Sequence, residues 1–303
     1  MRRRGTSTSL PDAQRASSSA QRGLTILSTF TARDEESGAI VRIFPTADVV
    51  ASLGGIRTIQ RHSGGGSTNL IYHGGPVQTA PKLYVVFWGS AWNLGGDPDG
   101  VATQLKSFYG AIGGSRWLNS VTQYTQSDGS HVGNGGSIFG GSYFDTTSSP
   151  PSSPTQSQMA AEAAKAAAHY GDYSPSASYV VAMPSGIRPS GFGTQYCAYH
   201  SSTSTSSGTI AWTNLPYMPD AGASCGANSV NSNGTLDGVT IVGGHEQGET
   251  ETDPQPNSGW LDGSGAENGD KCAWTGLENN PNAGGFPTQP LWSNATSSCV
   301  QSY

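Results

Sequence analysis

The chain has few charged residues: Asp, Glu, Lys and Arg make up only 12% of its 303 residues, and the net charge is −6. It has no dense block of Lys and Arg, which argues against a nucleic acid as partner. No apolar run approaches the roughly 18 residues that cross a membrane. A Gly-x-Ser-x-Gly elbow, a phosphate-binding loop and a dinucleotide fingerprint are also missing. These absences remove several common enzyme classes and leave a loop-rich chain with 42 Gly and 18 Pro.

Cysteine is scarce, and its distribution is informative. No Cys-x-x-Cys pair occurs, which makes a zinc ribbon or finger a poor interpretation. An even number in a loop-rich C-terminal part predicts two disulfides and an oxidising compartment. Sequence proximity favours the two nearest-neighbour pairings, while the other connectivities and free buried thiols stay open. The four residues are Cys197, Cys225, Cys272 and Cys299.

The start of the chain does not show a clear signal peptide. Met1 to Arg4 is basic, but the apolar stretch at 24–30 is shorter and more polar than a usual signal core. The cysteines and the low Lys content nevertheless favour an extracellular or cell-surface location. We expect residues 1–66 to be a disordered tail or pro-segment, with one strand-like patch at 39–44, because they are Ser-rich and end in Ser63-Gly64-Gly65-Gly66.

Residues 67–303 are expected to form a single loop-rich, disulfide-bearing α/β domain with a mixed sheet and flanking helices. The continuous apolar runs at 82–89 and 178–184 predict buried strands. The Ala-rich run at 159–170 predicts a helix between them, and this order suggests a parallel crossover. We interpret 129–157 as a functional or mobile loop and 185–235 as mostly loop. A zincin-like fold is one form that this architecture can take.

The stretch from His245 to Pro254 carries the strongest chemical signal. An apolar run from Leu236 to Val242 predicts that it continues a buried helix, and Pro254 is expected to end that helix. His245 and Glu249 then share one face, which Asp253 extends. One imidazole and one or two carboxylates suit a divalent cation, zinc above all. The alternative is a solvated acidic helix end with one incidental His.

Glu246 follows His245 directly, as the general base does in the zinc-protease motif His-Glu-x-x-His. In this sequence Glu249 stands where that motif has its second His. Gly243 and Gly244 each cost about 1 kcal/mol relative to Ala inside a helix. We therefore expect a neighbouring backbone or ligand to approach them closely, and the segment 72–75 is one candidate neighbour.

His200, Glu267 and Asp270 are further candidates for the site. Each has a simpler interpretation as a hydrogen-bonded structural His or a turn-stabilising carboxylate. A calcium site made of oxygen ligands from Asp253, Asp262, Glu267 and Asp270 is a separate possibility.

Several separated blocks resemble the exordium, or phosphate-induced protein 1, family and in particular its bacterial-type relatives. They cover roughly residues 69 to 300 in the same order as in that family. The resemblance implies a secreted or cell-surface, disulfide-bearing protein and does not supply a biochemical activity. The blocks are Tyr72-His73-Gly74-Gly75-Pro76, Cys197-Ala198-Tyr199-His200, His245-Glu246 with Glu249 and Thr252-Asp253-Pro254, Glu267 to Cys272, and Pro290 to Asn294 with Cys299.

Two functional hypotheses follow. The leading one is a secreted metal-dependent hydrolase, similar to a metallopeptidase and acting on a protein or peptide. In it His245 and Glu249 hold zinc, Glu246 is the catalytic base, and Asp253, Glu267, Asp270 or His200 completes the ligand set. The alternative is a non-catalytic extracellular signalling or cell-wall-associated binding protein of the exordium type. A Ser-His-Asp triad and a carboxylate-only hydrolase stay open as minor options.

Overall fold

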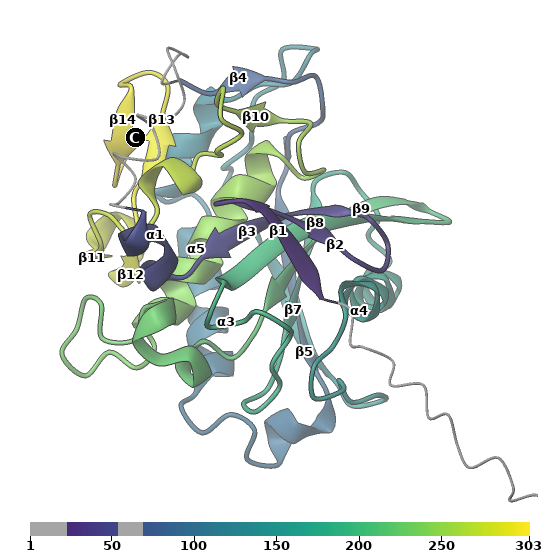
Figure 1. The fold of residues 1–303 in the computed structure, drawn as a ribbon. Coiled ribbons are helices and arrows are strands. Elements are labelled where there is room, and N and C mark those ends of the chain that lie inside the picture. Colours follow the sequence, from purple (N-terminus) through teal and green to yellow (C-terminus); the bar gives the residue numbers. More distant parts are fainter. Residues whose placement is uncertain (1–22, 54–68) are drawn as a thin grey trace, which may run out of the picture.

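The computed structural model describes residues 23–53 and 69–303. A sheet of eight strands forms its centre (Figure 1). The pairs β5–β6, β5–β7 and β7–β9 are parallel, and the pairs β1–β2, β2–β3, β3–β8 and β8–β9 are antiparallel. In spatial order the strands are β1 (Leu24–Ser28), β2 (Thr31–Asp34), β3 (Ile40–Pro45), β8 (Tyr196–Thr205), β9 (Gly208–Leu215), β7 (Ala177–Ala182), β5 (Lys82–Trp88) and β6 (Phe139–Asp145).

Helices cover both faces of this sheet. Tyr199 in β8 contacts Met159 of one helix, whereas the next residue, His200, lies against Glu246 of another. Neighbouring residues of a strand point to opposite faces, so these two helices, α4 and α5, lie on opposite sides. The mixed α/β architecture with flanking helices is confirmed. The helices are α1 (Ala47–Ser52), α3 (Val101–Ile112), α4 (Gln156–Tyr170) and α5 (Asp237–Thr252).

The β5–α4–β7 part follows the expectation from sequence. β5 and β7 pair in parallel, and α4 lies between them in the chain. α4 starts where Thr155 and Gln158 form a reciprocal capping box, and it ends at Gly171, which adopts the left-handed conformation with φ of 66°. Both ends are therefore specified by local residues.

Three segments differ from the expectation. β6 lies inside the predicted loop 129–157, and β8 and β9 form a long hairpin inside the predicted loop region 185–235. These strands are rich in Gly, Ser and Thr, so their composition resembles that of a loop. Pairing inside the sheet overrides this composition, because strand preference depends mainly on burial and on cross-strand neighbours.

The N-terminal part is the third difference. Residues 24–52, assigned above to a disordered tail or pro-segment, form β1, β2, β3 and α1, with β3 almost wholly buried. The patch at 39–44 is apolar enough to pair as a full strand of the main sheet. Residues 24–52 are therefore ordered, and their interpretation as a pro-segment stays a prediction. The glycine run at 64–66 lies outside the described residues.

Short elements complete the C-terminal part. Two disulfides, Cys197–Cys225 and Cys272–Cys299, confirm the predicted count and the nearest-neighbour pairing. Each encloses a loop of a length that corresponds to about 3 kcal/mol of stabilisation, and such bonds suggest a secreted or extracellular protein. The short elements are β4 (Ile71–Tyr72), β10 (Trp260–Leu261), β11 (Glu278–Asn280), β12 (Phe286–Thr288), β13 (Leu291–Ser293), β14 (Ser298–Val300), η1 (Ser90–Asn93), η2 (Leu118–Gln123), η3 (Met218–Cys225), η4 (Asp270–Cys272) and η5 (Pro281–Ala283).

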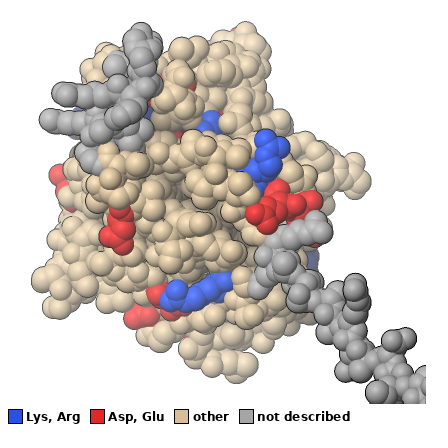
Figure 2. All heavy atoms as spheres, viewed as in Figure 1, with Lys and Arg blue, Asp and Glu red and all other residues tan. Residues whose placement is uncertain are grey.

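The surface carries few charged side chains. On the face drawn in Figure 2, small groups of Lys, Arg, Asp and Glu lie among uncharged residues, and several groups contain both signs; this face shows no continuous basic patch among the described residues. Within the same residues, no helix combines the length and apolarity that a membrane crossing requires.

Candidate metal centre

Helix α5 provides three of the residues singled out from sequence, and all 16 of its residues are buried. Gly243 and Gly244 allow this burial. A Cβ on Gly243 would lie 2.8 Å from the Tyr109 hydroxyl, and one on Gly244 would lie 3.0 Å from the Trp117 ring. A close neighbour is thus present, but it consists of these aromatic side chains rather than the segment 72–75. Because glycine carries no side chain beyond a hydrogen atom, Tyr109 and Trp117 can pack directly against the backbone of α5, and this helix can lie deep in the molecule.

His245, Glu249 and Asp270 form one group of possible metal ligands. His245 Nε2 lies 3.0 Å from Glu249 Oε1 and 3.8 Å from Asp270 Oδ1. The first pair comes from adjacent turns of α5, as predicted, and Asp270 comes from the loop that returns to the helix. Three candidates separated by up to 25 positions in sequence therefore meet at one point.

His200, Glu246 and Glu249 form a second group on the other side of Glu249. His200 Nδ1 lies 3.3 Å from Glu246 Oε2 and 3.7 Å from Glu249 Oε2. The other ring nitrogen, Nε2, lies 3.6 Å from Glu267 Oε1. Glu249 thus presents one oxygen to each group. We call these six residues, His200, His245, Glu246, Glu249, Glu267 and Asp270, the central cluster.

The spacing of these atoms fits a single small cation in either group. Donor atoms about 2.0–2.2 Å from a tetrahedral zinc ion lie about 3.3–3.6 Å apart. The nitrogen-to-oxygen separations of 3.0 and 3.8 Å around His245, and of 3.3 and 3.7 Å around His200, bracket that range. All three ligand atoms of each group lie within 4.8 Å of one another.

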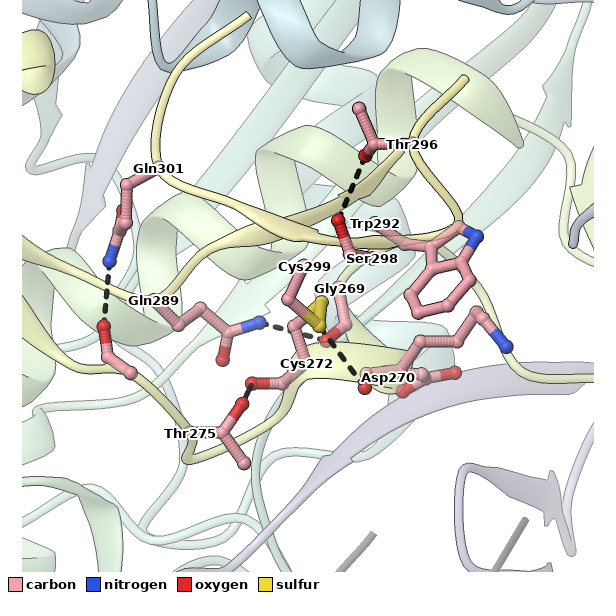
Figure 3. The surroundings of a disulfide bond; sticks show 12 residues. Gly269, Asp270, Cys272, Thr275, Gln289, Trp292, Thr296, Ser298, Cys299 and Gln301 are labelled. Carbon is pink, nitrogen blue, oxygen red and sulfur yellow. Dashed lines mark hydrogen bonds between the residues drawn. A yellow bond between two sulfur atoms is a disulfide. The ribbon is translucent and has the colours of Figure 1, made fainter. Parts of the chain in front are cut away.

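The loop that carries Glu267 and Asp270 is held closely against α5. A Cβ on Gly269 would lie 2.8 Å from His245 Nδ1, so only glycine permits this approach. The side-chain amide of Gln289 donates to the Gly269 carbonyl and lies 3.2 Å from His245 Nδ1. Figure 3 shows Gly269 and Asp270 beside the Cys272–Cys299 disulfide, which fixes the far end of the loop.

Asp253, predicted from spacing as a further ligand, does not belong to either group. Its carboxylate accepts hydrogen bonds from the backbone amides of Asn257, Ser258 and Gly259 and so stabilises the turn after α5. Asp262 similarly accepts from the backbone of its own turn and from Lys271 Nζ at 3.0 Å. The oxygen-only set considered for calcium is therefore not assembled at one point by the described residues.

Burial changes the protonation of the whole central cluster. It lowers the pKa of His245 to about 4, and together with the charges of Arg42 and His245 it lowers that of His200 to about 3. Both rings are thus neutral at pH 7, and neutral imidazole is the form that binds metals. Burial also raises the pKa of Glu249 to about 8.

The other three carboxyls shift in the same direction. Burial, followed by repulsion from Glu249, raises the pKa of Glu246, Glu267 and Asp270 well above the usual range. Four buried carboxyls this close together cannot all be ionised unless positive charge is supplied. Among the described residues, Arg42 is the only Lys or Arg that forms an ion pair with them, 3.5 Å from Glu267 Oε2. A divalent cation would supply the missing charge and displace the protons.

Several polar atoms of the central cluster have no hydrogen-bond partner within the described structure. Buried polar atoms are usually paired, so an unpaired set at one point requires an explanation. Two pairs of these atoms face each other, His245 Nε2 with Asp270 Oδ1 at 3.8 Å and His200 Nε2 with Glu267 Oε1 at 3.6 Å, and the first pair belongs to the group of His245, Glu249 and Asp270, which favours a metal there. The unpaired atoms are His200 Nε2, His245 Nε2, Glu246 Oε1, both carboxylate oxygens of Glu267, and Asp270 Oδ1.

The sequence analysis did not identify three residues that surround the cluster. Arg42 reaches it from β3, the Phe44 ring stacks on His245 with centroids 3.8 Å apart, and Gln289 lies next to the His245 ring. A single Arg in an apolar strand, at position 42, was the one available signal, because a lone charge in a buried strand usually has a partner. Nothing in the sequence around Gln289 indicates its role.

Comparisons of the chain with protein families, with curated proteins and with solved structures find no match in any of the three. The resemblance to the exordium family stays a prediction.

Proposed function

We propose that this protein is a metal-dependent hydrolase of the metallopeptidase type, with zinc as its metal. The observation that carries the proposal is the convergence of two neutral imidazoles and four carboxyls, all buried, with unpaired nitrogen and oxygen atoms facing one another. The ligand chemistry, nitrogen together with oxygen, suits zinc better than calcium, which takes oxygen ligands only.

In the proposed arrangement His245, Glu249 and Asp270 hold the ion. Bound there, a divalent ion would act as a Lewis acid on a substrate carbonyl and on a water molecule. Glu246 is next to this group and is not part of it, so it is free to take the proton of the attacking water. His200, with Nδ1 3.3 Å from Glu246 Oε2, holds that carboxylate in position. Burial raises the pKa of Glu246 in the metal-free protein, and a cation bound beside it would lower that pKa and leave the carboxylate able to accept the proton.

The experiment compares metal content and hydrolysis in purified wild type and two matched variants. Glu246→Gln should reduce hydrolysis of a protein substrate such as casein by at least about 100-fold and keep the zinc, because general bases contribute about 10²–10⁴-fold. Glu251→Gln makes the same change on the same helix, where Glu251 pairs with Gln247 and stands outside the central cluster. This control should keep both metal and activity.

Metal content is measured by elemental analysis, and activity with and without a chelator. A folded wild type that contains no metal, takes up no added zinc and hydrolyses nothing would rule the proposal out. The alternative of a non-catalytic binding protein would then take its place.

A further inference from the structure

An enzyme site must admit its substrate, and every residue of the central cluster is at most 1% exposed. Strand β3 is what closes the site on the side of β8. Arg42 pairs in register with His200, and Phe44 pairs with Ala198. Side chains of paired residues share one face of a sheet, so Arg42 and Phe44 both point toward the cluster. Figure 1 shows β3 beside β8 and next to α5.

The last residues of β3 make contacts similar to those of a bound peptide. Residues 40–42 pair with β2 on one edge of β3, whereas Arg42 to Pro45 pair with β8 on the other edge, and Trp274 Nε1 donates to the Pro45 carbonyl at 2.9 Å. The Phe44 ring lies between His245 and Trp274, with centroid distances of 3.8 and 4.7 Å. Arg42 extends toward Glu267 and also donates to the Gly265 carbonyl. Alternate side chains thus occupy an acidic and an aromatic pocket.

The topology makes this strand separable from the rest of the sheet. In the strand order β1-β2-β3-β8, the three N-terminal strands are joined to the remaining sheet only through β3 and β8. They also precede the residues at 54–68 in the chain. Without them, β8 would be an edge strand, with His200 on the face of the sheet that lies against α5. Extended peptides bind such edges by adding a strand: the backbone gives affinity, and pockets for alternate side chains give specificity.

We infer that β3 occupies the substrate groove of the proposed hydrolase, so that residues 24–52 inhibit the enzyme from within its own chain. The substrates are extended polypeptides that pair with β8 in place of β3. They present a basic side chain to Glu267 and, two residues later, an aromatic or large apolar side chain to the space between His245 and Trp274. This inference rests on the proposed function for its catalytic part and on the β3–β8 geometry for its binding part.

The test uses the full chain with a site-specific protease sequence in place of Ser63 to Gly66, loaded with zinc. Hydrolysis of labelled casein is measured before cutting, after cutting, and after dilution, and gel filtration reports whether the N-terminal fragment has left. We expect activity to rise at least ten-fold on release. A synthetic peptide of residues 39–46 should restore inhibition, and the same peptide with Arg42→Glu should require at least ten-fold higher concentration.

Two single variants of the uncut chain test the same point if the fragment stays bound or the cut protein loses its fold. Phe44→Ala removes a side chain that faces the cluster, whereas Ile43→Ala alters the neighbouring residue, which faces the opposite side with Tyr199. Phe44→Ala should raise casein hydrolysis several-fold at unchanged zinc content. Ile43→Ala should leave the rate unchanged while lowering the melting temperature.

The outcomes separate this inference from the proposed function. Zinc-dependent hydrolysis that is equal before and after fragment release, or equal in the Phe44→Ala and Ile43→Ala variants, would overturn the inhibition and leave the hydrolase standing. Absence of hydrolysis in every state, with the 39–46 peptide still binding the cut protein, would overturn the hydrolase and leave the peptide groove. Absence of both would overturn both.

Discussion

Two buried groups of carboxyls in this molecule differ in how their charge is balanced. At the end of β6, Asp145 and Glu162 are almost fully buried, and Lys165 Nζ pairs with both. Lys165 itself stays 41% exposed, so the charge of the pair remains partly in water. In the central cluster four carboxyls share the single charge of Arg42, whose side chain is 3% exposed. Two carboxyls share one positive charge in the first group and four share one in the second, so the deficit of positive charge is larger in the central cluster.

The contrast shows why burial of acidic residues is not by itself a sign of a metal site. Asp145 also accepts hydrogen bonds from the backbone amide and the hydroxyl of Thr147, so most of its oxygen lone pairs are used. Unpaired oxygens and nitrogens in the central cluster point at one another instead. What distinguishes a candidate metal site is therefore the count of unsatisfied ligand atoms, not the count of carboxyls.

The largest effect is expected from removing a proposed ligand. His245→Ala should lose the metal and reduce hydrolysis by more than about 100-fold, because even changes to residues behind a ligand cost about 10–100-fold in affinity or activity. Glu249→Ala should behave alike. Glu162→Gln changes a buried carboxyl of the group around Lys165, and this variant should keep both the metal and the hydrolytic activity. Elemental analysis and casein hydrolysis measure the metal content and the activity of each variant. Loss of metal in Glu162→Gln would contradict the proposed difference between the two groups of carboxyls.

A smaller effect should follow from removing each positive charge. Arg42→Met leaves Glu267 buried without its ion partner, which should cost roughly 3–5 kcal/mol in the metal-free protein. Lys165→Met removes a charge that is much more exposed, and the expected cost is about 1 kcal/mol. Urea unfolding with chelator present measures both. Equal losses of unfolding free energy in the two variants would show that the exposure of a cation does not decide how much it contributes to stability.

The smallest effect concerns pH. Burial raises the pKa of Glu249 and of Glu251 to about 8, so between their unfolded values and pH 8 the folded, metal-free protein binds more protons than the unfolded chain. Stability contributed by these protonated carboxyls is present at low pH and is lost as pH rises toward 8. The lowered pKa values of His200 and His245 act in the opposite direction, but only below about 6.5.

From pH 6.5 to 8 the metal-free protein should therefore lose stability on the order of 1 kcal/mol per pH unit for each of these two carboxyls. Glu249→Gln should reduce this slope, and saturating zinc should abolish it. Melting temperatures at pH 6.5 and 8 with chelator test the sign. A metal-free wild type that becomes more stable over this interval would show that the carboxyls are not held protonated.

The sequence alone determined the elements whose signals are local. The apolar runs specified β5 and β7, the Ala-rich run with its cap residues specified α4, and the spacing of His245 and Glu249 placed both on one face of α5. Proximity along the chain also favoured the disulfide pairing that the structure shows, but it left the other connectivities open. Each of these depends on residues within a few turns, or on the short distance between two cysteines.

Only the tertiary structure decided the composition of the site. His200 and Asp270 reach α5 from β8 and from a loop held by Gly269, and Glu267 of the same loop meets His200. Arg42 comes from β3, more than 220 positions before its contacts Gly265 and Glu267 in the chain. Asp253 has the right helical spacing, yet its oxygens are used by three backbone amides of the following turn. Spacing along a helix shows which side chains share a face, but which groups meet that face, and which are already hydrogen-bonded, depends on how the rest of the chain packs against it.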